Sequence, residues 1–510
     1  MTEPTYVIDP FERWMITIAV MLVAVVEVID MTIVNVALPN MQGALGANTD
    51  QITWVLTSYI VSSAICMPLT GFLVTRLGRK RLLLINIVGF LASSMLCGMS
   101  VSLPQMVFFR ILQGIFGATL VPMSQYILRD TFPKNEQGKA MAIWGIGIMA
   151  GPILGPTIGG YITDALNWRW IFYVNIPVCI MAFFMTLKFI TETPRSKPFI
   201  DWFGLFLMAM GIGTLQIFLD EGNEYNWLDS NGMVILFVMS LYFLSYFVIR
   251  GWNYRRNIIN LHLFKDHNLT MATILLTLYC MLVFGLLTLQ PIMMQDLLNY
   301  PVLTTGIVMA PRGFSSGFSM FVVSKLMGKV DLRIIIVIGL LLSAAGTYGM
   351  TQYSLYISEP YLIWTGVIQG FGMGLIFVPL STLALATISR EQGAEASGLF
   401  SFGRSIGSSI GISALSTVLA QESQINWNRL GGNLNAANPA LYQWITAHQL
   451  SLSNPLTAQL LGADLNAQSS MIAFVDCYYL IFLAFLAMIP MVFLLRQPQL
   501  KTFDPAVLGH

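Results

Sequence analysis

The chain has 510 residues, of which 56% are hydrophobic and only 10% are charged, and its mean hydropathy is +0.70. Soluble domains carry roughly 25% charged residues, so this composition excludes a soluble globular protein and indicates an integral membrane protein with little mass outside the bilayer. The net charge of only +1 argues against nucleic acid as a partner.

Apolar runs of about 20 residues, the length that spans the hydrocarbon of a bilayer as a helix, follow one another along the chain. The first run is of full length, so it is expected to stay as an uncleaved anchor rather than act as a signal peptide. Fourteen such runs predict an all-α polytopic membrane protein with 14 transmembrane helices, at 14–36, 52–75, 83–101, 105–129, 138–163, 169–190, 202–219, 232–250, 269–290, 304–326, 333–353, 359–388, 395–420 and 471–495.

The segments between the runs differ in charge. Basic residues gather in alternate segments, at 76–81, 134–139, 188–197, 250–265 and 325–333. The intervening loops hold few basic residues but carry Asp220, Glu221, Glu224 and Asp229. Because cytoplasmic loops are enriched in Lys and Arg, both termini are predicted to be cytoplasmic.

A pattern of small and polar residues occurs twice. Gln113-Gly114 in the fourth run matches Gln369-Gly370 in the twelfth, and each run is followed by Glu-Gln-Gly and then by a run with glycine at every fourth position. Small residues also recur by chance, but the shared order favours two related six-helix bundles. We therefore predict an N-terminal bundle over 1–192, a two-helix insert with cytoplasmic linkers over 193–265, and a C-terminal bundle over 266–510. The outer loop of the C-terminal bundle, 421–470, could form a small amphipathic helical cap.

The fifth run contains a stripe of glycines with two prolines. Glycines four residues apart lie along one side of a helix and allow a neighbouring backbone to approach closely, while prolines bend the helix. This pattern predicts a bent helix at a moving interface, although simple small-residue packing gives the same glycines. The stripe consists of Gly147, Gly151, Pro152, Gly155, Pro156 and Gly159.

Six ionisable residues lie inside apolar runs: Glu27, Asp30, Arg110, Arg312, Arg404 and Asp476. Each costs roughly 2.5–3.5 kcal/mol at the centre of a bilayer unless it is paired, wet or neutralised. Glu27 and Asp30 are three residues apart, on nearly one face of a helix, and should titrate as a coupled pair. Such a pair is suited to carrying a proton.

The depth of each charge identifies possible partners. Asp30 and Arg110 both lie about 8–9 Å inside the outer end of their helices, at 1.5 Å per residue. We expect Arg110 to form a salt bridge with Asp30 or Glu27 that is lost on protonation; a fixed structural pair is the alternative. Arg312 and Arg404 lie near mid-membrane and are possible cavity charges that balance acids or contact anionic substrates. Asp476, close to the outer end of its helix, is a weaker candidate of the same kind.

The loop after the second run combines Gly71 and Gly78 with the basic cluster Arg79-Lys80-Arg81. The glycines allow close approach between neighbouring helices, which favours a gating loop, although the basic residues alone fit a cytoplasmic loop. The five cysteines are isolated in apolar runs, and neither an HExxH metal motif nor a GxxxxGK[ST] phosphate loop occurs. We therefore expect no metal, no cofactor and no enzymatic activity.

Several of these segments resemble the major facilitator superfamily, and among its members the fourteen-span drug:proton antiporters of the EmrB/QacA group. The resemblance lies in Asp30–Pro39, Leu69–Leu73, Arg110–Gly114, Gly151–Pro156, Trp170–Pro177 and Leu219–Gly222. It implies a proton-driven multidrug efflux antiporter that exports lipophilic compounds by alternating access, with the proton gradient as its energy source. Two departures are Thr75, where the family loop usually has an acid, and Glu27, an extra acid one turn before Asp30.

The resemblance also implies location and partners. A protein of this group lies in the inner (cytoplasmic) membrane, in contact with lipid, and contributes to antibiotic resistance. EmrB-like members work with an EmrA-like periplasmic adaptor and a TolC-like outer-membrane channel, whereas QacA-like members work alone. The competing hypothesis is a proton-coupled carrier of a single metabolite, such as a siderophore, an amino acid or another organic ion.

Overall fold

The computed structural model describes residues 9–133, 136–254, 257–434, 438–447 and 455–496. Within these ranges the chain is helical, with no strand apart from an isolated bridge between Met327 and Val330. Eleven helical segments among the described residues are long and apolar enough to cross a membrane. The helices α8 (Gln137–Ala165), α14 (Val302–Leu326) and α17 (Gly393–Gly431) are also long but richer in glycine and hydroxyl side chains, so the count of 14 spans stays a prediction.

The first half of the chain forms a helical bundle around α1. Helix α1 packs against α7, α8 and α10, while α6 packs against both α3 and α5. Besides α8, the elements of this half are α1 (Pro10–Leu45), α2 (Thr49–Ile52), α3 (Trp54–Cys66), η1 (Met67–Leu69), α4 (Thr70–Leu77), α5 (Arg79–Met99), α6 (Leu103–Gly117), α7 (Leu120–Thr131), α9 (Trp170–Tyr173) and α10 (Asn175–Phe189).

The second half forms a bundle in which α13 packs on α17 and α16 packs on both α14 and α15, with α19 covering α15 and α17. Its other elements are η4 (Leu261–Lys265), α13 (His267–Ile292), η5 (Met293–Leu297), α15 (Leu332–Met350), α16 (Glu359–Ala386), α18 (Pro439–Ala447) and α19 (Pro455–Val492). Between the two bundles in sequence lie α11 (Trp202–Glu221), η3 (Trp227–Asp229) and α12 (Asn231–Asn253).

Local signals explain where several helices begin. The Asp201 carboxylate accepts from the amide of Gly204 at the start of α11, and that of Asp266 accepts from the amide of Leu269 in the first turn of α13. Acidic N-caps satisfy amides that have no partner within the helix. Pro68 falls in the 3₁₀ turn η1, which separates α3 from α4.

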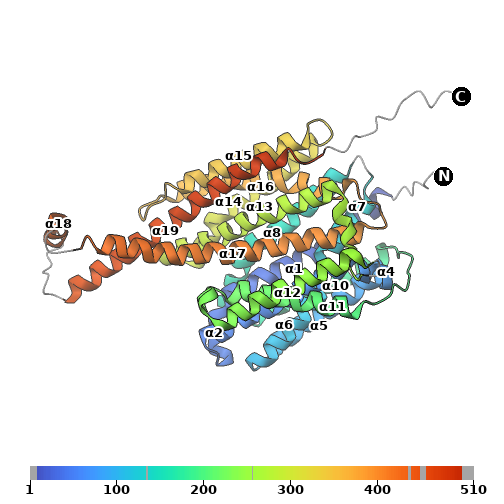
Figure 1. Cartoon of the computed structure of the whole chain (residues 1–510), viewed down its shortest axis with the longest axis horizontal. Helices are drawn as coiled ribbons and strands as arrows, with labels where there is room; N and C mark the ends of the chain where they lie inside the picture. The colour runs from blue at the N-terminus through green and yellow to red at the C-terminus, as the bar shows by residue number, and fades with distance from the viewer. Residues whose placement is uncertain (1–8, 134–135, 255–256, 435–437, 448–454, 497–510) are drawn as a thin grey trace.

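Two helices extend well beyond the bilayer-length runs. Helix α17 continues to Gly431 and α19 starts at Pro455, and in Figure 1 both project to the left of the other helices, with α18 at their tip. The predicted outer loop over 421–470 is therefore wrong as a loop, because most of its described part is helical. The fall in hydropathy near residue 420 marks a change in polarity and not a helix end.

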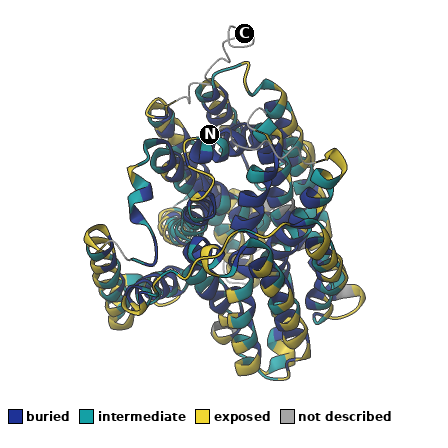
Figure 2. Cartoon of the chain, turned by 90° about the vertical axis from the view of Figure 1, so that its right-hand side faces the viewer, coloured by how far each residue is buried: buried dark blue, intermediate teal, exposed yellow. Residues whose placement is uncertain are grey.

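Two sets of helices form the contacts between the halves. Helix α8 packs along α14, and α17 packs on α4 and α7. The rings of Trp144 on α8 and Phe377 on α16 stack with centroids 5.5 Å apart. Buried positions gather where helices meet, and exposed positions lie on the outer surface (Figure 2).

Helix α11 packs on both α3 and α17. The Gln216 amide donates to Ser409 Oγ at 2.8 Å, and Trp227 Nε1 donates to Thr417 Oγ1 at 2.9 Å. The insert is therefore attached to both halves. Asp220 and Glu221, which the sequence placed in an outer loop, instead lie within α11, and Glu221 is buried. That prediction is wrong because the acids end an apolar run without ending the helix.

Candidate functional site

The carboxylate of Asp30 lies at the centre of a buried polar network in the first bundle. Its Oδ2 accepts from Arg110 Nη1 at 2.8 Å. Its Oδ1 accepts from Gln113 Nε2 at 2.9 Å and from Asn175 Nδ2 at 2.7 Å. Asp30 and Arg110 are both fully buried. Helices α1, α6 and α10 together thus surround one carboxylate with three donors.

Arg110 is held from several directions. Its Nε donates to the Val55 carbonyl at 3.0 Å, and its Nη1 also donates to Gln113 Oε1 at 2.7 Å. The guanidinium lies over the ring of Tyr59, 4.2 Å from the centroid. The structure thus contains the Arg110–Asp30 ion pair expected from depth along the helices, and its part in proton coupling stays a proposal.

Glu27 connects this network to the other half of the molecule. Tyr59 OH donates to Glu27 Oε1 at 3.3 Å, and Glu27 interacts electrostatically with both Asp30 and Arg404. Arg404 lies on α17 and is buried. Three of the predicted site residues in the first bundle are thus brought together, and Arg404 faces them from the second.

Sequence reasoning missed the neutral members of the network. Ser94 Oγ accepts from Gln113 Nε2 at 2.7 Å and from Asn175 Nδ2 at 3.1 Å, which ties both amides to α5. Gln113 and Asn175 occur within the segments that carry the family resemblance. A signal for Gln113 was present in its spacing, three residues after Arg110 and on the same helix face, but it was not used.

The glycine stripe of α8 faces α1 within the same bundle. A Cβ at Gly151 would lie 2.3 Å from Val28, one at Gly155 2.0 Å from Thr32 Oγ1, and one at Gly159 2.7 Å from Ile33. A Cβ at Gly147 would lie 2.1 Å from the end of the Met21 side chain. Pro152 and Pro156 lie within the same helix, and the side chain of Pro156 is outside the described part of the structure.

Other glycines bring α8 to the second half. A Cβ at Gly145 would lie 2.9 Å from Met320, and one at Gly306 on α14 would lie 2.4 Å from Thr157. The stripe thus positions α1, where Glu27 and Asp30 lie, and a different set of glycines lines the contact between the halves.

The predicted gating loop also contacts the second half. A Cβ at Gly71 would lie 2.4 Å from the Cβ of Glu395 on α17. Gly78 has φ +85°, a conformation that favours glycine, and ends α4. Arg79 pairs with Asp130 at 2.5 Å, and Asp130 also faces Arg390 of the second half at 3.8 Å.

The two remaining candidate charges lie apart from Asp30. Arg312 is buried on α14 within the second bundle. Asp476 is exposed on α19, where its Oδ2 accepts from Asn426 Nδ2 at 3.2 Å. Within the described residues, no group of three or more His, Cys, Asp or Glu lies close enough to hold a metal ion.

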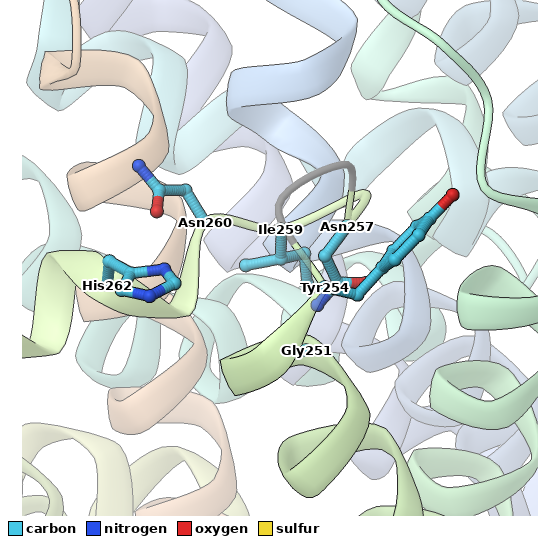
Figure 3. Close-up of a pocket in the computed structure, with 6 residues that line it drawn as sticks. All are labelled: Gly251, Tyr254, Asn257, Ile259, Asn260 and His262. Carbon is cyan, nitrogen blue, oxygen red and sulfur yellow. The ribbon is translucent and has the colours of Figure 1, made fainter.

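Two surface hollows lie away from the network. One of about 330 Å³ is open and apolar, lined by Pro360, Ile363, Trp364 and Val367 on α16. The other, of about 50 Å³, lies beyond the end of α12 and is lined by Gly251, Tyr254, Asn257, Ile259, Asn260 and His262 (Figure 3). The second has room for one or two water molecules only, and the Asn260 amide beside it donates to Glu395 Oε1 at 2.6 Å.

Comparison with known proteins agrees with this architecture. A family model described as Major Facilitator Superfamily matches residues 20–412. The chain is 34% identical to fatty acid resistance protein FarB of Neisseria gonorrhoeae over 487 residues, covering 95% of this chain and 96% of that protein. It is 32% identical to multidrug export protein EmrB of Escherichia coli over 492 residues, covering 94% and 95%.

A solved structure of the human organic anion transporter MFSD10 superposes with a TM-score of 0.61 at 14% identity, covering 93% of this chain and 99% of that one. At that identity the likeness concerns the fold alone. The family match and the two bacterial relatives extend over most of the chain. The protein therefore belongs to the major facilitator superfamily, a family of membrane transporters rather than enzymes.

Proposed function

We propose that the protein is a proton-driven efflux antiporter that exports lipophilic compounds across the inner (cytoplasmic) membrane by alternating access between its two halves. Two of its relatives are named for multidrug export and for fatty acid resistance, which supports lipophilic cargo. The energy source is the proton gradient, and no cofactor takes part.

The observation that carries the proposal is the environment of Asp30. Three donors, one of them a guanidinium, satisfy a carboxylate that is out of contact with solvent. Burial disfavours the ionised acid, whereas the charge-assisted hydrogen bonds favour it. A proton that binds Asp30 removes the negative charge opposite Arg110, so the two protonation states require different arrangements of α1 and α6.

Such a change reaches the interface between the halves through neighbouring contacts. Tyr59 touches Arg110 with its ring and Glu27 with its hydroxyl, and Glu27 faces Arg404 on α17. In the proposed cycle, substrate and proton compete for these charges, so that loading one favours release of the other. Alternating access places the substrate pocket between the halves near mid-membrane.

We also propose that the chain crosses the membrane fourteen times and that both termini are cytoplasmic. The start of α1 and the end of α19 lie at the end of the molecule that carries the basic segments: Arg13 pairs with Glu136 at 2.8 Å, and His267 Nε2 bonds to the Leu494 carbonyl at 2.7 Å. Figure 1 places α4 and α7 at this same end. The excess of Lys and Arg there supports a cytoplasmic orientation.

We further propose that the protein works with an EmrA-like periplasmic adaptor and a TolC-like outer-membrane channel. The similarity to EmrB supports this assembly. Co-purification of the three proteins after co-expression in a host with two membranes tests it, and recovery of the transporter alone under conditions that preserve membrane complexes would argue for independent action.

The central test uses purified protein in liposomes with an imposed pH gradient. Addition of a lipophilic cation should release protons from the acidic side for the wild type, and this flux should be lost in Asp30→Asn. Asp476→Asn, the same change at an exposed acid outside the network, should behave as the wild type. Absence of flux with any lipophilic compound, from folded protein, would instead favour a carrier of a single metabolite.

A further inference from the structure

The guanidinium of Arg312 is buried in the second bundle, and the described part of the chain provides no counter-ion for it. Among the described residues, none of its three nitrogens has a hydrogen-bond partner, and no acid forms an ion pair with it. Tyr279, Tyr353 and Tyr478 are the groups that interact with it electrostatically. An uncompensated charge in a bundle interior is strongly unfavourable. We therefore expect an anion to bind beside Arg312.

The repeat between the two halves identifies what is missing. In the first half, Gly151 and Gly155 of α8 pack on Val28 and Thr32 of α1, and Asp30 lies midway between those two residues. In the second half, Gly407 and Gly411 of α17 pack on Thr277 and Met281 of α13, and the residue midway between these is Tyr279. Tyrosine therefore takes the place of the acid.

The other members of the network have counterparts too. Gly114, after Gln113, packs on the backbone of Tyr59, and Gly370, after Gln369, packs on the backbone of Arg312. Arg312 is thus the counterpart of Tyr59. Three residues before each glutamine, the first half has Arg110 and the second has Gly366. The second bundle thus has the glutamine at the equivalent position and an arginine at a different one, and no carboxylate among the described residues pairs with that arginine.

Side chains around Arg312 offer further donors without partners. Both amide atoms of Gln369 and the hydroxyl of Ser316 are buried without a hydrogen-bond partner in the described structure, whereas Gln113 donates to both Asp30 and Ser94. A Cβ built at Gly366 would meet only Arg312, at 3.7–3.8 Å, within a 4 Å radius. Gly366, one turn before Gln369 on α16, thus adjoins the side chain of Arg312 without a clash.

We propose that Arg312 and Gln369 bind a singly charged anion, the carboxylate of a ligand, which supplies the negative charge that Asp30 provides in the first bundle. Arginine and a primary amide are the donors that hold the Asp30 carboxylate, and the arginine fork fits a carboxylate better than a spherical ion. Tyr353 lies in the connection between α15 and α16, which places the site toward the end of the molecule opposite α4 and α7. Binding of an anion at this site does not require that the protein be a proton antiporter.

Binding can be measured without transport. The melting temperature of the purified protein in detergent is recorded against sodium hexanoate, sodium chloride or hexylammonium sulfate, in a sodium sulfate background of constant ionic strength. Hexanoate should raise the melting temperature of the wild type saturably, because a ligand that binds only the folded state stabilises it. Arg312→Gln should need roughly tenfold more hexanoate or more, since charge-assisted hydrogen bonds are lost.

A second variant covers the case in which Arg312→Gln fails to fold. Gly366→Asp places a carboxylate beside Arg312, and it should abolish the response to hexanoate while the protein stays folded. Gly366→Ala adds a methyl group in ordinary contact and should keep the response. A saturable response to chloride alone would overturn the carboxylate assignment. No response, or an equal response in Arg312→Gln and Gly366→Asp, would overturn the site.

Discussion

The guanidinium of Arg110, which forms an ion pair with Asp30, lies 4.2 Å from the centroid of the Tyr59 ring. The hydroxyl of the same tyrosine donates to Glu27 at 3.3 Å. Tyr59 therefore contacts the counter-ion of one acid and hydrogen-bonds the other. Because Glu27 also faces Arg404 of the second half, this tyrosine connects the buried ion pair to the interface at which the halves must move.

Tyr59→Phe separates the two contacts of the tyrosine. The ring over Arg110 remains, but the donor to Glu27 is removed, and a single hydrogen bond contributes about 1 kcal/mol. We expect the initial rate of substrate-driven proton flux to fall about fivefold, a decrease that corresponds to that energy. Tyr59→Ala, which also removes the ring, should reduce the flux further. Equal rates for Tyr59→Phe and the wild type would exclude a part for this hydroxyl.

Glu27→Gln tests whether the extra acid selects positive charge. Removing the carboxylate lowers the attraction for cations in a site of low dielectric constant, so binding of a lipophilic cation should weaken by on the order of tenfold. A neutral compound of similar size should bind as before. Equilibrium binding to both probes provides the measurement, and equal loss for the two would indicate structural damage instead of charge selectivity.

Gly71→Ala tests the contact between the gating loop and α17. Its Cβ would lie 2.4 Å from Glu395 Cβ and 2.6 Å from Glu395 Cα, so the present packing of α4 on α17 cannot persist. The population should shift toward conformations in which this end is open. We expect alkylation of a cysteine introduced at the buried Ser397, in a protein without its natural cysteines, to become about tenfold faster.

Gly213→Ala is the matched control for that experiment. Its Cβ would meet Ile65 at 3.4 Å, an ordinary contact, and labelling at position 397 should not change. If Gly71→Ala labels no faster than this control, the two elements do not form a closed gate.

The ion pair between Asp201 and Arg250 fastens the two helices of the insert outside the bilayer. Burial raises the pKa of the Asp201 carboxyl, but hydrogen bonds from Arg250, at 2.9 Å, and from the Gly204 amide outweigh burial and hold the pKa below its ordinary value. A depressed folded-state pKa gives stability that is present above the unfolded-state pKa and lost as the pH falls through the folded one.

Asp201→Asn should therefore lower the stability of the protein at neutral pH, by about 1–3 kcal/mol, and the difference from wild type should shrink in acid, below about pH 4. Thermal unfolding of both proteins between neutral and acidic pH checks this. A difference that stays constant with pH would show that the charge of Asp201 does not matter.

Part of this architecture could be predicted from sequence because a bilayer requires long apolar helices and makes buried charges rare. The apolar runs gave the helices, and the rarity of buried charge singled out Asp30 and Arg110, whose equal depth then suggested their pairing. The neutral hydrogen-bond partners of Asp30 and Gln113 give no comparable signal in the sequence. Ser94 and Asn175 are ordinary residues for a membrane helix until the fold brings α5 and α10 to the same carboxylate.

Other features depend on tertiary structure alone. The apolar run ends before the helix does at the outer end of α11 and along α17, so Asp220, Glu221 and the segment after residue 420 were placed in loops. The isolation of Arg312 could not be recognised either, because the sequence shows a charge but not the absence of its partner among the described residues.

The most direct test of the central claim compares two modes of transport by Asp30→Asn in liposomes. Exchange of labelled for unlabelled substrate at equal pH needs alternating access but no net proton movement, whereas uphill export driven by a pH gradient needs both. We predict that the variant keeps exchange near the wild-type rate and loses uphill export. Uphill export at the wild-type level in Asp30→Asn would contradict the role proposed for this carboxylate.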